Sequence, residues 1–169
     1  MIFGLVYTTF LTRFALDMTA EERQDFLRGI PIFAGLDDGA LLSIAQATQE
    51  SAHQVGTVIV REGDPGSRMF IVHSGRVEVI KHLASPKQTL LATFGPRDFM
   101  GEMSMIESVT RSASVRALEE TFLFGLRGID LYRLFQQRPD QYAIVILNIA
   151  RDLSRRLRAL DEKFSAVSH

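Results

Sequence analysis

Apolar residues in the first part of the chain recur at the three- and four-residue steps of an α-helix. We predict a helix over 20–28, because Thr19 and Glu22 have the spacing of a capping box. A second helix is predicted over 38–50, where an aspartate precedes the run GALLSIAQATQE. The folded unit should therefore begin with two short helices.

The helical period returns after residue 126. A short helix is predicted over 130–137, with Pro139 just beyond it, and a long helix over 140–164. Seven apolar residues form one stripe along the long helix: Tyr142, Ile146, Ile149, Leu153, Leu157, Leu160 and Phe164. The stripe could pack on the chain's own N-terminal helices or on its copy in a second subunit. We expect part of the stripe to pack on the same stripe of a second copy, so that the chain forms a homodimer.

Between these helical regions the pattern is that of short strands. The β-branched and aromatic runs lie at 57–61, 69–73, 76–81, 89–94, 112–117 and 121–126. Glycine-rich turns separate them, and Gly63, Gly66 and Gly75 are expected to supply a positive φ there. We predict an α+β fold: an antiparallel β-roll or jelly roll over 51–126, flanked by the N-terminal helices and the long C-terminal helix.

The first 18 residues, MIFGLVYTTFLTRFALDM, are apolar up to Arg13. This run is shorter than the ~20 residues that span a bilayer, and it lacks the basic start and cleavage site of a signal peptide. We interpret 1–18 as an amphipathic extension that precedes a single domain over 19–169. A membrane or partner anchor is the alternative.

Composition excludes several classes of function. The net charge of −1 gives no general attraction to nucleic acid or to an anionic membrane. The chain has no cysteine, which excludes disulfides and thiolate metal sites, and its four histidines lack metal-ligand spacing. No nucleophile–base pair is visible, so we expect a binding protein and not an enzyme. We expect its location to be cytoplasmic.

Candidate chemistry lies in the segment FMGEMSMIESVTRSASV, residues 99–115. Arg111 could donate a forked pair of hydrogen bonds to an anionic phosphate, and Gly101 would let the backbone approach it. Glu102 could accept a hydrogen bond from a hydroxyl group. The alternative is a surface ion pair between Glu102 and Arg111, which would contribute at most about 1 kcal/mol.

This segment, together with GDPGSRMFIVHSGRVEVI at 63–80, resembles the cyclic-nucleotide-binding domain of the catabolite activator protein, kinase regulatory subunits and cyclic-nucleotide-gated channels. The resemblance covers 30–164, and 99–115 resembles the family's phosphate-binding cassette. It implies a β-roll that binds cAMP or cGMP without a metal. The residues that it assigns to the ligand are Gly101, Glu102, Met103, Ser104, Arg111, Ser112, Ala113, Leu160 and Asp161.

Within this assignment Arg111 would hold the cyclic phosphate and Glu102 the ribose 2′-OH. Leu160 would cap the base and Asp161 would accept from an exocyclic amine. These two residues do not decide between the bases, and we expect a slight preference for cAMP. The sequence departs from the family pattern at Met100, which separates Phe99 from the glycine. It departs again where serine replaces alanine at 104 and threonine replaces proline at 110.

The predicted function is a regulatory sensor that signals by movement of its C-terminal helix to a second copy or to an unknown protein effector. The sequence ends five residues beyond Phe164, so we expect no DNA-binding domain. One alternative is a degenerate cyclic-nucleotide fold that serves as a dimerisation or docking scaffold without ligand. Another is an enzyme that binds a different anionic ligand, such as a sugar phosphate.

Overall fold

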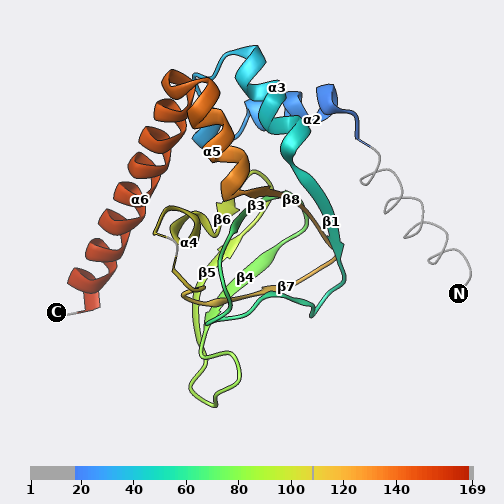
Figure 1. Cartoon of the computed structure of the whole chain (residues 1–169). Coiled ribbons are helices and arrows are strands. Elements are labelled where there is room, and N and C mark those ends of the chain that lie inside the picture. Colours follow the sequence, from blue (N-terminus) through green and yellow to red (C-terminus); the bar gives the residue numbers. More distant parts are fainter. Residues whose placement is uncertain (1–17, 108, 168–169) are drawn as a thin grey trace, which may run out of the picture.

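The computed structural model of the protein describes residues 18–107 and 109–167. Short helices gather at one end of a β-roll, and a long helix runs from that end along one side of it (Figure 1). The predicted extension over 1–18 lies outside the described residues except for Met18, so the division of the chain at residue 19 stays a prediction.

The helical elements are α2 (Ala20–Arg28), η1 (Pro31–Phe33), α3 (Asp38–Ala47), α4 (Glu102–Glu107), α5 (Gly128–Gln137) and α6 (Pro139–Val167). The strands are β1 (Gln49–His53), β2 (Val58–Val60), β3 (Arg68–Ser74), β4 (Val77–Lys81), β5 (Thr89–Phe94), β6 (Phe99–Met100), β7 (Ser114–Ala117) and β8 (Thr121–Arg127). The six predicted runs correspond to β2, β3, β4, β5, β7 and β8. Two strands, β1 and β6, were not predicted.

Local capping explains where α2 begins. The Glu22 N–H donates to the Thr19 hydroxyl at 3.2 Å, and the Glu22 carboxylate accepts from the Thr19 N–H at 2.8 Å. The prediction for the second helix was wrong at its end, because α3 stops at Ala47 and not at residue 50. Thr48 is extended there, and Gln49 begins a strand whose backbone pairs with β8.

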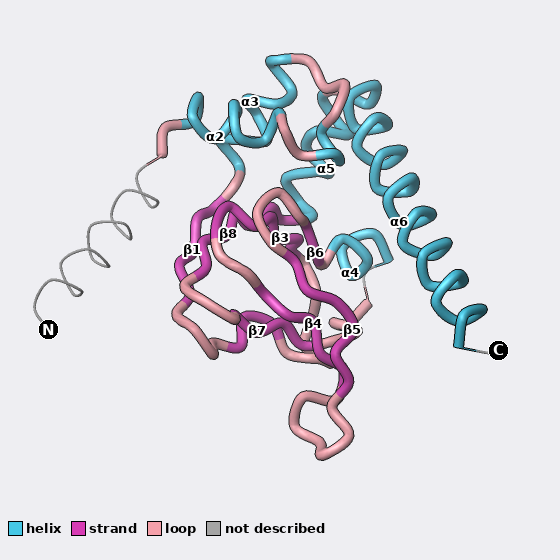
Figure 2. Tube along the Cα trace, turned by 180° about the vertical axis from the view of Figure 1, so that it is seen from behind, coloured by secondary structure: helices cyan, strands magenta, loops and turns pink. Residues whose placement is uncertain are grey.

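The strands form two four-stranded antiparallel sheets, in the orders β1-β8-β3-β6 and β2-β7-β4-β5. The predicted α+β fold with an antiparallel β-roll is confirmed. Strand β8 lies inside the first sheet, and its residues are buried from Thr121 to Leu126 because the helices cover one face and the second sheet the other. Figure 2 shows α2, α3 and α5 at one end of the roll and the β4–β5 loop extending from the opposite end.

Two apolar cores result from this arrangement. The larger lies between the helices and the first sheet, and the smaller lies inside the roll between the two sheets. Strand β6 contributes to both, since Phe99 belongs to the helical core and Met100 to the roll core. Successive residues of a strand point to opposite faces, which explains how these two neighbours are divided.

Helices α5 and α6 each begin before the predicted residue, at Gly128 and Pro139. The first half of α6 packs on the other helices, where Ile149 is fully buried and the Asn148 side-chain amide donates to the Ala34 carbonyl at 2.8 Å. The second half passes beside α4, and Leu157 is largely exposed there (Figures 1 and 2). The predicted stripe therefore packs partly on the chain's own helices. None of the helices in the described ranges has a stretch that is long and apolar enough for a membrane span.

Candidate functional site

All the predicted site residues except Asp161 line one cavity of about 520 Å³. The cavity lies between α4, the roll and the second half of α6. The chain thus brings its cassette segment and its last helix to the same space. The structure does not bring Asp161 there, since it is an exposed residue of α6.

Arg111 is held at one end of the cavity by backbone carbonyls. Its Nη2 donates to the Arg68 carbonyl at 2.5 Å and its Nη1 to the Gly101 carbonyl at 3.3 Å. Only 8% of the residue is exposed, and burial away from water lowers the pKa of the guanidinium. A guanidinium has five N–H donors, so these two bonds fix its orientation and leave capacity for an anion in the cavity.

Glycine is required at position 101 for two reasons. Its φ is +86°, which side chains with a Cβ rarely adopt. A Cβ there would also lie 2.5 Å from Nη1 of Arg111 and 3.0 Å from the Arg68 carbonyl. The turn therefore lets the start of α4 lie directly against the arginine.

Helix α4 begins immediately after this glycine, at Glu102. The N–H groups of the first turn of a helix have no intrahelical acceptor. Met103 and Ser104, which contribute such groups, both line the cavity. Backbone donors and a guanidinium consequently lie at the same end of the cavity.

Glu102 is almost completely buried, with 2% of the residue exposed. Its carboxylate forms an ion pair with Arg156 of α6, at 3.3 Å between Nη1 and Oε1, and not with Arg111. Burial raises the pKa of the Glu102 carboxyl, while the positive charges of Arg156 and Arg111 act in the opposite direction. The alternative of an ion pair between the two cassette residues is therefore not what the structure contains.

Sequence reasoning missed two polar residues of α6 that line the cavity, Lys163 and the Glu102 partner Arg156. Arg156 lies seven residues after Ile149 and three after Leu153, which places it on the apolar stripe of α6. A cation on an apolar stripe was the available signal. The neighbouring arginines of α6, Arg151, Arg155 and Arg158, do not line the cavity.

The rest of the cavity wall is mostly apolar, with Lys163 of α6 as a charged exception. The roll contributes Val60, Phe70, Val79, Phe94 and Val115, and α6 contributes Leu153, Leu157 and Leu160. These apolar side chains belong to both the roll and α6, so their convergence depends on tertiary structure. They form a space suited to a flat, weakly polar group next to the charged end.

The β2–β3 loop supports the cassette from outside. The Arg111 N–H donates to the Asp64 carbonyl at 2.8 Å, and the Gly63 N–H donates to the Arg111 carbonyl at 2.9 Å. The predicted positive φ is present at Gly63 and Gly75 but is wrong for Gly66, which lies outside the left-handed region. Gly66 is needed for close contact, because a Cβ there would lie 2.2 Å from the Ser104 Cβ.

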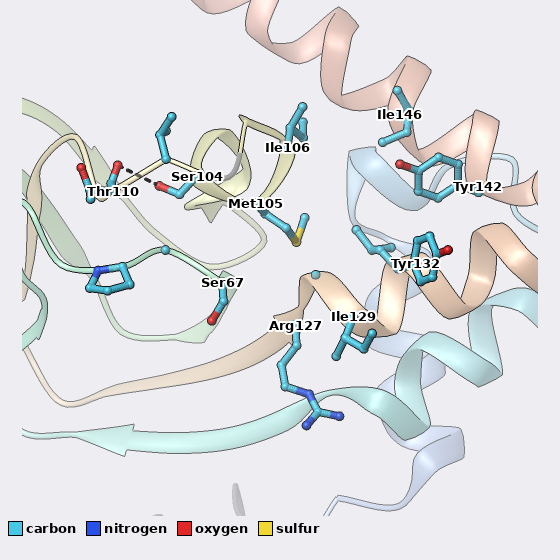
Figure 3. Close-up of a pocket in the computed structure, with 15 residues that line it drawn as sticks. Ser67, Ser104, Met105, Ile106, Thr110, Arg127, Ile129, Tyr132, Tyr142 and Ile146 are labelled. Carbon is cyan, nitrogen blue, oxygen red and sulfur yellow. Dashed lines mark hydrogen bonds between the residues drawn. The ribbon is translucent and has the colours of Figure 1, made fainter.

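A larger cavity, of about 740 Å³, lies on the other side of α4. Figure 3 shows Met105 and Ile106 of α4 near Tyr142 and Ile146 of α6. Its one lining cation, Arg127, is engaged by Asp130 through hydrogen bonds of 2.8 and 2.9 Å. The smaller cavity, with Arg111 and the start of α4, is therefore the better candidate for an anionic ligand.

Among residues 18–107 and 109–167 no group of three or more histidine, aspartate or glutamate side chains could hold a metal ion.

Comparison with known proteins gives a consistent result. A family model described as cyclic nucleotide-binding domain matches residues 52–138. The cyclic AMP receptor protein of Thermus thermophilus is 34% identical over 143 residues, which are 84% of this chain and 64% of that protein. A cyclic nucleotide-gated potassium channel of Rhizobium etli is 35% identical over 124 residues, 70% of this chain and 33% of the channel.

Among solved structures, the N-terminal domain of a transcriptional regulator from Streptomyces coelicolor superposes with a TM-score of 0.68 at 32% identity. That match covers 78% of this chain and 94% of the other. The chain spans less than two thirds of the two curated relatives, 64% and 33% of their lengths.

Proposed function

Because the chain belongs to the cyclic nucleotide-binding domain family, we propose that the cavity beside α4 binds a cyclic nucleotide and that the chain acts as a regulatory sensor. The observation that carries the proposal is the convergence of Arg111, Glu102 and the start of α4 in one cavity. The role is one of binding and signalling, and no catalytic step is proposed.

The cyclic phosphate would lie at the charged end of the cavity. Arg111 would donate charge-assisted hydrogen bonds to its exocyclic oxygens. The N–H groups of Met103 and Ser104 would add neutral donors, and the exposed Ser112 lies next to the arginine in the cavity wall. Such a site suits a small anionic group with one negative charge, as in a cyclic phosphodiester.

The ribose 2′-OH would donate to Glu102, and the base would enter the apolar part of the cavity against Leu160. A free inorganic phosphate fits this arrangement poorly, because a carboxylate repels it unless a hydroxyl donor lies between them. The ligand is thus expected to carry a sugar hydroxyl.

Either cAMP or cGMP satisfies these contacts. We retain cAMP as the first candidate because a 34% identical relative is a cyclic AMP receptor protein. Asp161 gives no support to that choice, since it does not line the cavity. The polar side chains that α6 does present to the cavity are Arg156 and Lys163, both hydrogen-bond donors.

Helix α6 would carry the signal. It lines the cavity through Leu153, Leu157 and Leu160, so a ligand contacts α4 and α6 together. Binding would shift a pre-existing equilibrium between positions of α6, and a coupling of about 1–3 kcal/mol would suffice. A second copy of the chain or a protein effector would then read the changed surface of α6.

The departures from the family pattern leave the cavity groups in place. Met100 is buried in the roll core and lines the cavity. Ser104 fits beside Gly66, with its hydroxyl 3.5 Å from the Thr110 carbonyl that accepts from it. These contacts favour a binding cavity over the alternative of a scaffold without ligand.

Isothermal titration calorimetry with cAMP and cGMP tests the proposal on the wild type, Arg111→Ala and Arg61→Ala. Removal of one partner of a desolvated charge pair costs about 2–5 kcal/mol, so Arg111→Ala should weaken binding by about 30-fold or more. Arg61 is exposed and does not line the cavity, so its variant should bind like the wild type. Unchanged affinity in Arg111→Ala, or no heat and no thermal shift in the wild type, would reject the function.

A further inference from the structure

The short segment that carries Arg111 into the cavity is not part of a strand. Backbone pairing of β4 with β7 ends at Ile80 and Ser114, and residues 111–113 lie just before β7 begins. Ser112 is exposed and lines the cavity beside Arg111. The position of this part of the cavity wall therefore depends on contacts outside the two sheets.

Two different elements supply these contacts. The β2–β3 loop holds Arg111, whose N–H donates to the Asp64 carbonyl and whose carbonyl accepts from the Gly63 N–H. The carbonyl of the next residue, Ser112, accepts from the side-chain amine of Lys81 at 2.6 Å. Lys81 is the last residue of β4. The segment is thus held from the β2–β3 loop and from the end of a strand.

Lys81 is itself oriented by Glu62 of the β2–β3 loop. The Lys81 amine lies 2.8 Å from Oε1 of Glu62, and Oε2 of the same carboxylate accepts from the His82 N–H at 2.8 Å. The Glu62 N–H donates to the Ser114 hydroxyl at 3.0 Å. The hydrogen bond from Lys81 is the main cause that lowers the pKa of the Glu62 carboxyl. The pair is therefore charged at neutral pH.

We propose that Lys81 is a positioning residue for the phosphate end of the cavity. It fixes the Ser112 peptide, so that the hydroxyl and N–H of Ser112 meet the cyclic phosphate beside Arg111; this step rests on the proposed function. Lys81 is not a ligand itself, because it does not line the cavity and because Glu62 compensates its charge. It acts on the ligand through Ser112.

An exposed serine gains from being fixed in advance. Hydrogen bonds weaken steeply when the donor and acceptor are displaced or misaligned. A side chain that must be ordered when the ligand arrives also reduces the affinity by the entropy that it loses. The contact from Lys81 orders the Ser112 peptide before binding, so its removal should weaken the phosphate contact and leave the apolar part of the cavity unchanged.

The matched variants are Lys81→Met, Lys81→Arg and Lys87→Met. Methionine keeps an unbranched side chain and removes the ammonium group. Arginine keeps the charge and has enough N–H donors for both the Glu62 carboxylate and the Ser112 carbonyl. Lys87 is an exposed residue of the β4–β5 loop that does not line the cavity, so its variant controls for the loss of one positive charge.

Calorimetric titration with cAMP and cGMP compares these proteins. We expect Lys81→Met to bind about tenfold more weakly than the wild type, because a hydrogen bond from a charged donor is lost. Lys81→Arg should recover most of the affinity, and Lys87→Met should bind like the wild type. Wild-type affinity in Lys81→Met, or an equal loss in Lys81→Met and Lys87→Met, would overturn the proposal.

A double-variant cycle with Ser112→Ala separates positioning from a general effect on the fold. If Lys81 acts through Ser112, the effect of Lys81→Met on affinity should be at least about threefold smaller when the Ser112 hydroxyl is already absent. A purely structural role of Lys81 would weaken binding by the same factor in both backgrounds. Equal factors would therefore overturn the proposal.

Hydrogen–deuterium exchange of the full chain without ligand makes the two possible failures distinguishable. Residues 111–113 should exchange about tenfold faster in Lys81→Met than in Lys87→Met. Equal exchange would show that Lys81 does not fix the segment. If the wild type binds neither nucleotide, the proposed function fails, and the positioning of the phosphate fails with it. If the wild type binds and Lys81→Met binds equally well, the function stands and the positioning alone is rejected.

Discussion

The contact between Gly66 and Ser104 sets how closely α4 can approach the β2–β3 loop. Gly66 lines the larger cavity, and Ser104 lines both. A Cβ at position 66 would lie 2.2 Å from the Ser104 Cβ and 2.7 Å from its hydroxyl oxygen. A single hydrogen atom on the loop thus controls the position of the helix whose N–H groups face the proposed phosphate.

Gly66→Ala should weaken cyclic-nucleotide binding by about tenfold or more, since α4 must shift away from its place in the cavity. Gly66→Ala combined with Ser104→Gly moves the Cβ from one side of the contact to the other and should recover part of the affinity. Calorimetric titration of the two proteins makes the comparison. A double variant no better than the single one would contradict this account.

Gly63→Ala is the control for backbone strain. Gly63 has a φ of +87° with open space around its Cβ position. Its alanine variant should lose about 1–2 kcal/mol of unfolding free energy and keep its ligand affinity. Thermal unfolding followed by titration separates the two effects.

Residues close together in the sequence were the ones that could be predicted. Gly101, Glu102 and Arg111 lie in one short segment, so their residue types and spacing were enough to predict an anion site. Arg156 is 54 residues from Glu102, and nothing local connects them. Its place on the stripe of α6 was visible in the sequence, but its partner depends on how α6 docks.

At the scale of elements, α2 docks on the first sheet through an aromatic group. The His73 ring of β3 lies 4.8 Å from Phe26 of α2 and 5.2 Å from Phe124 of β8, between ring centroids. Phe26 and Phe124 are themselves 5.5 Å apart. His73 is half-buried, and burial lowers the pKa of its imidazole below the ordinary 6.5. We therefore expect the docking of α2 to depend on pH.

Proton binding by His73 determines whether folding stability rises or falls with pH. Below pH 6.5 the unfolded chain binds a proton at His73 more readily than the folded chain, so folding stability falls as pH decreases from 6.5 toward the folded pKa. His53, also lowered by burial, contributes with the same sign. His73→Phe should make the unfolding free energy less dependent on pH between about 7 and 5.

Urea unfolding at several pH values measures this. The control is His82→Asn, which changes an exposed histidine and leaves the contact with α2 intact. A His73→Phe profile as steep as that of the control would show that His73 does not link α2 docking to pH.

The boundaries of helices and strands could be predicted where nearby residues set them and were missed where distant residues did. The capping box of Thr19 and Glu22 lies within one turn, and α2 begins where it predicts. The end of α3 was missed because residues after Ala47 pair with β8, far along the chain. Strand β6 has two residues, too few to produce a periodic pattern.

At the scale of the whole molecule, α6 presents a second row of residues to solvent. The row consists of exposed small or apolar side chains at alternating steps of four and three: Ala143, Leu147, Ala150 and Ser154. This spacing is that of the a and d positions of a coiled coil. It lies beside the predicted stripe, whose first half is covered by the chain's own helices. A homodimer through α6 is therefore proposed to use this row.

Leu147→Glu should weaken self-association by about tenfold or more, because each copy would bring a carboxylate to the centre of the contact. Half of Leu147 is exposed, and it lines neither cavity. Leu118→Glu is the control, since Leu118 is 42% exposed and lies outside α6. Sedimentation equilibrium at several concentrations, with and without cyclic nucleotide, measures the association.

If the two variants associate equally, or the wild type is a monomer throughout, α6 signals to a different protein. A ligand-dependent change in the dimer constant would instead give the movement of α6 its readout, since a helix that lines the cavity with Leu153 and faces its copy with Leu147 couples the two contacts directly.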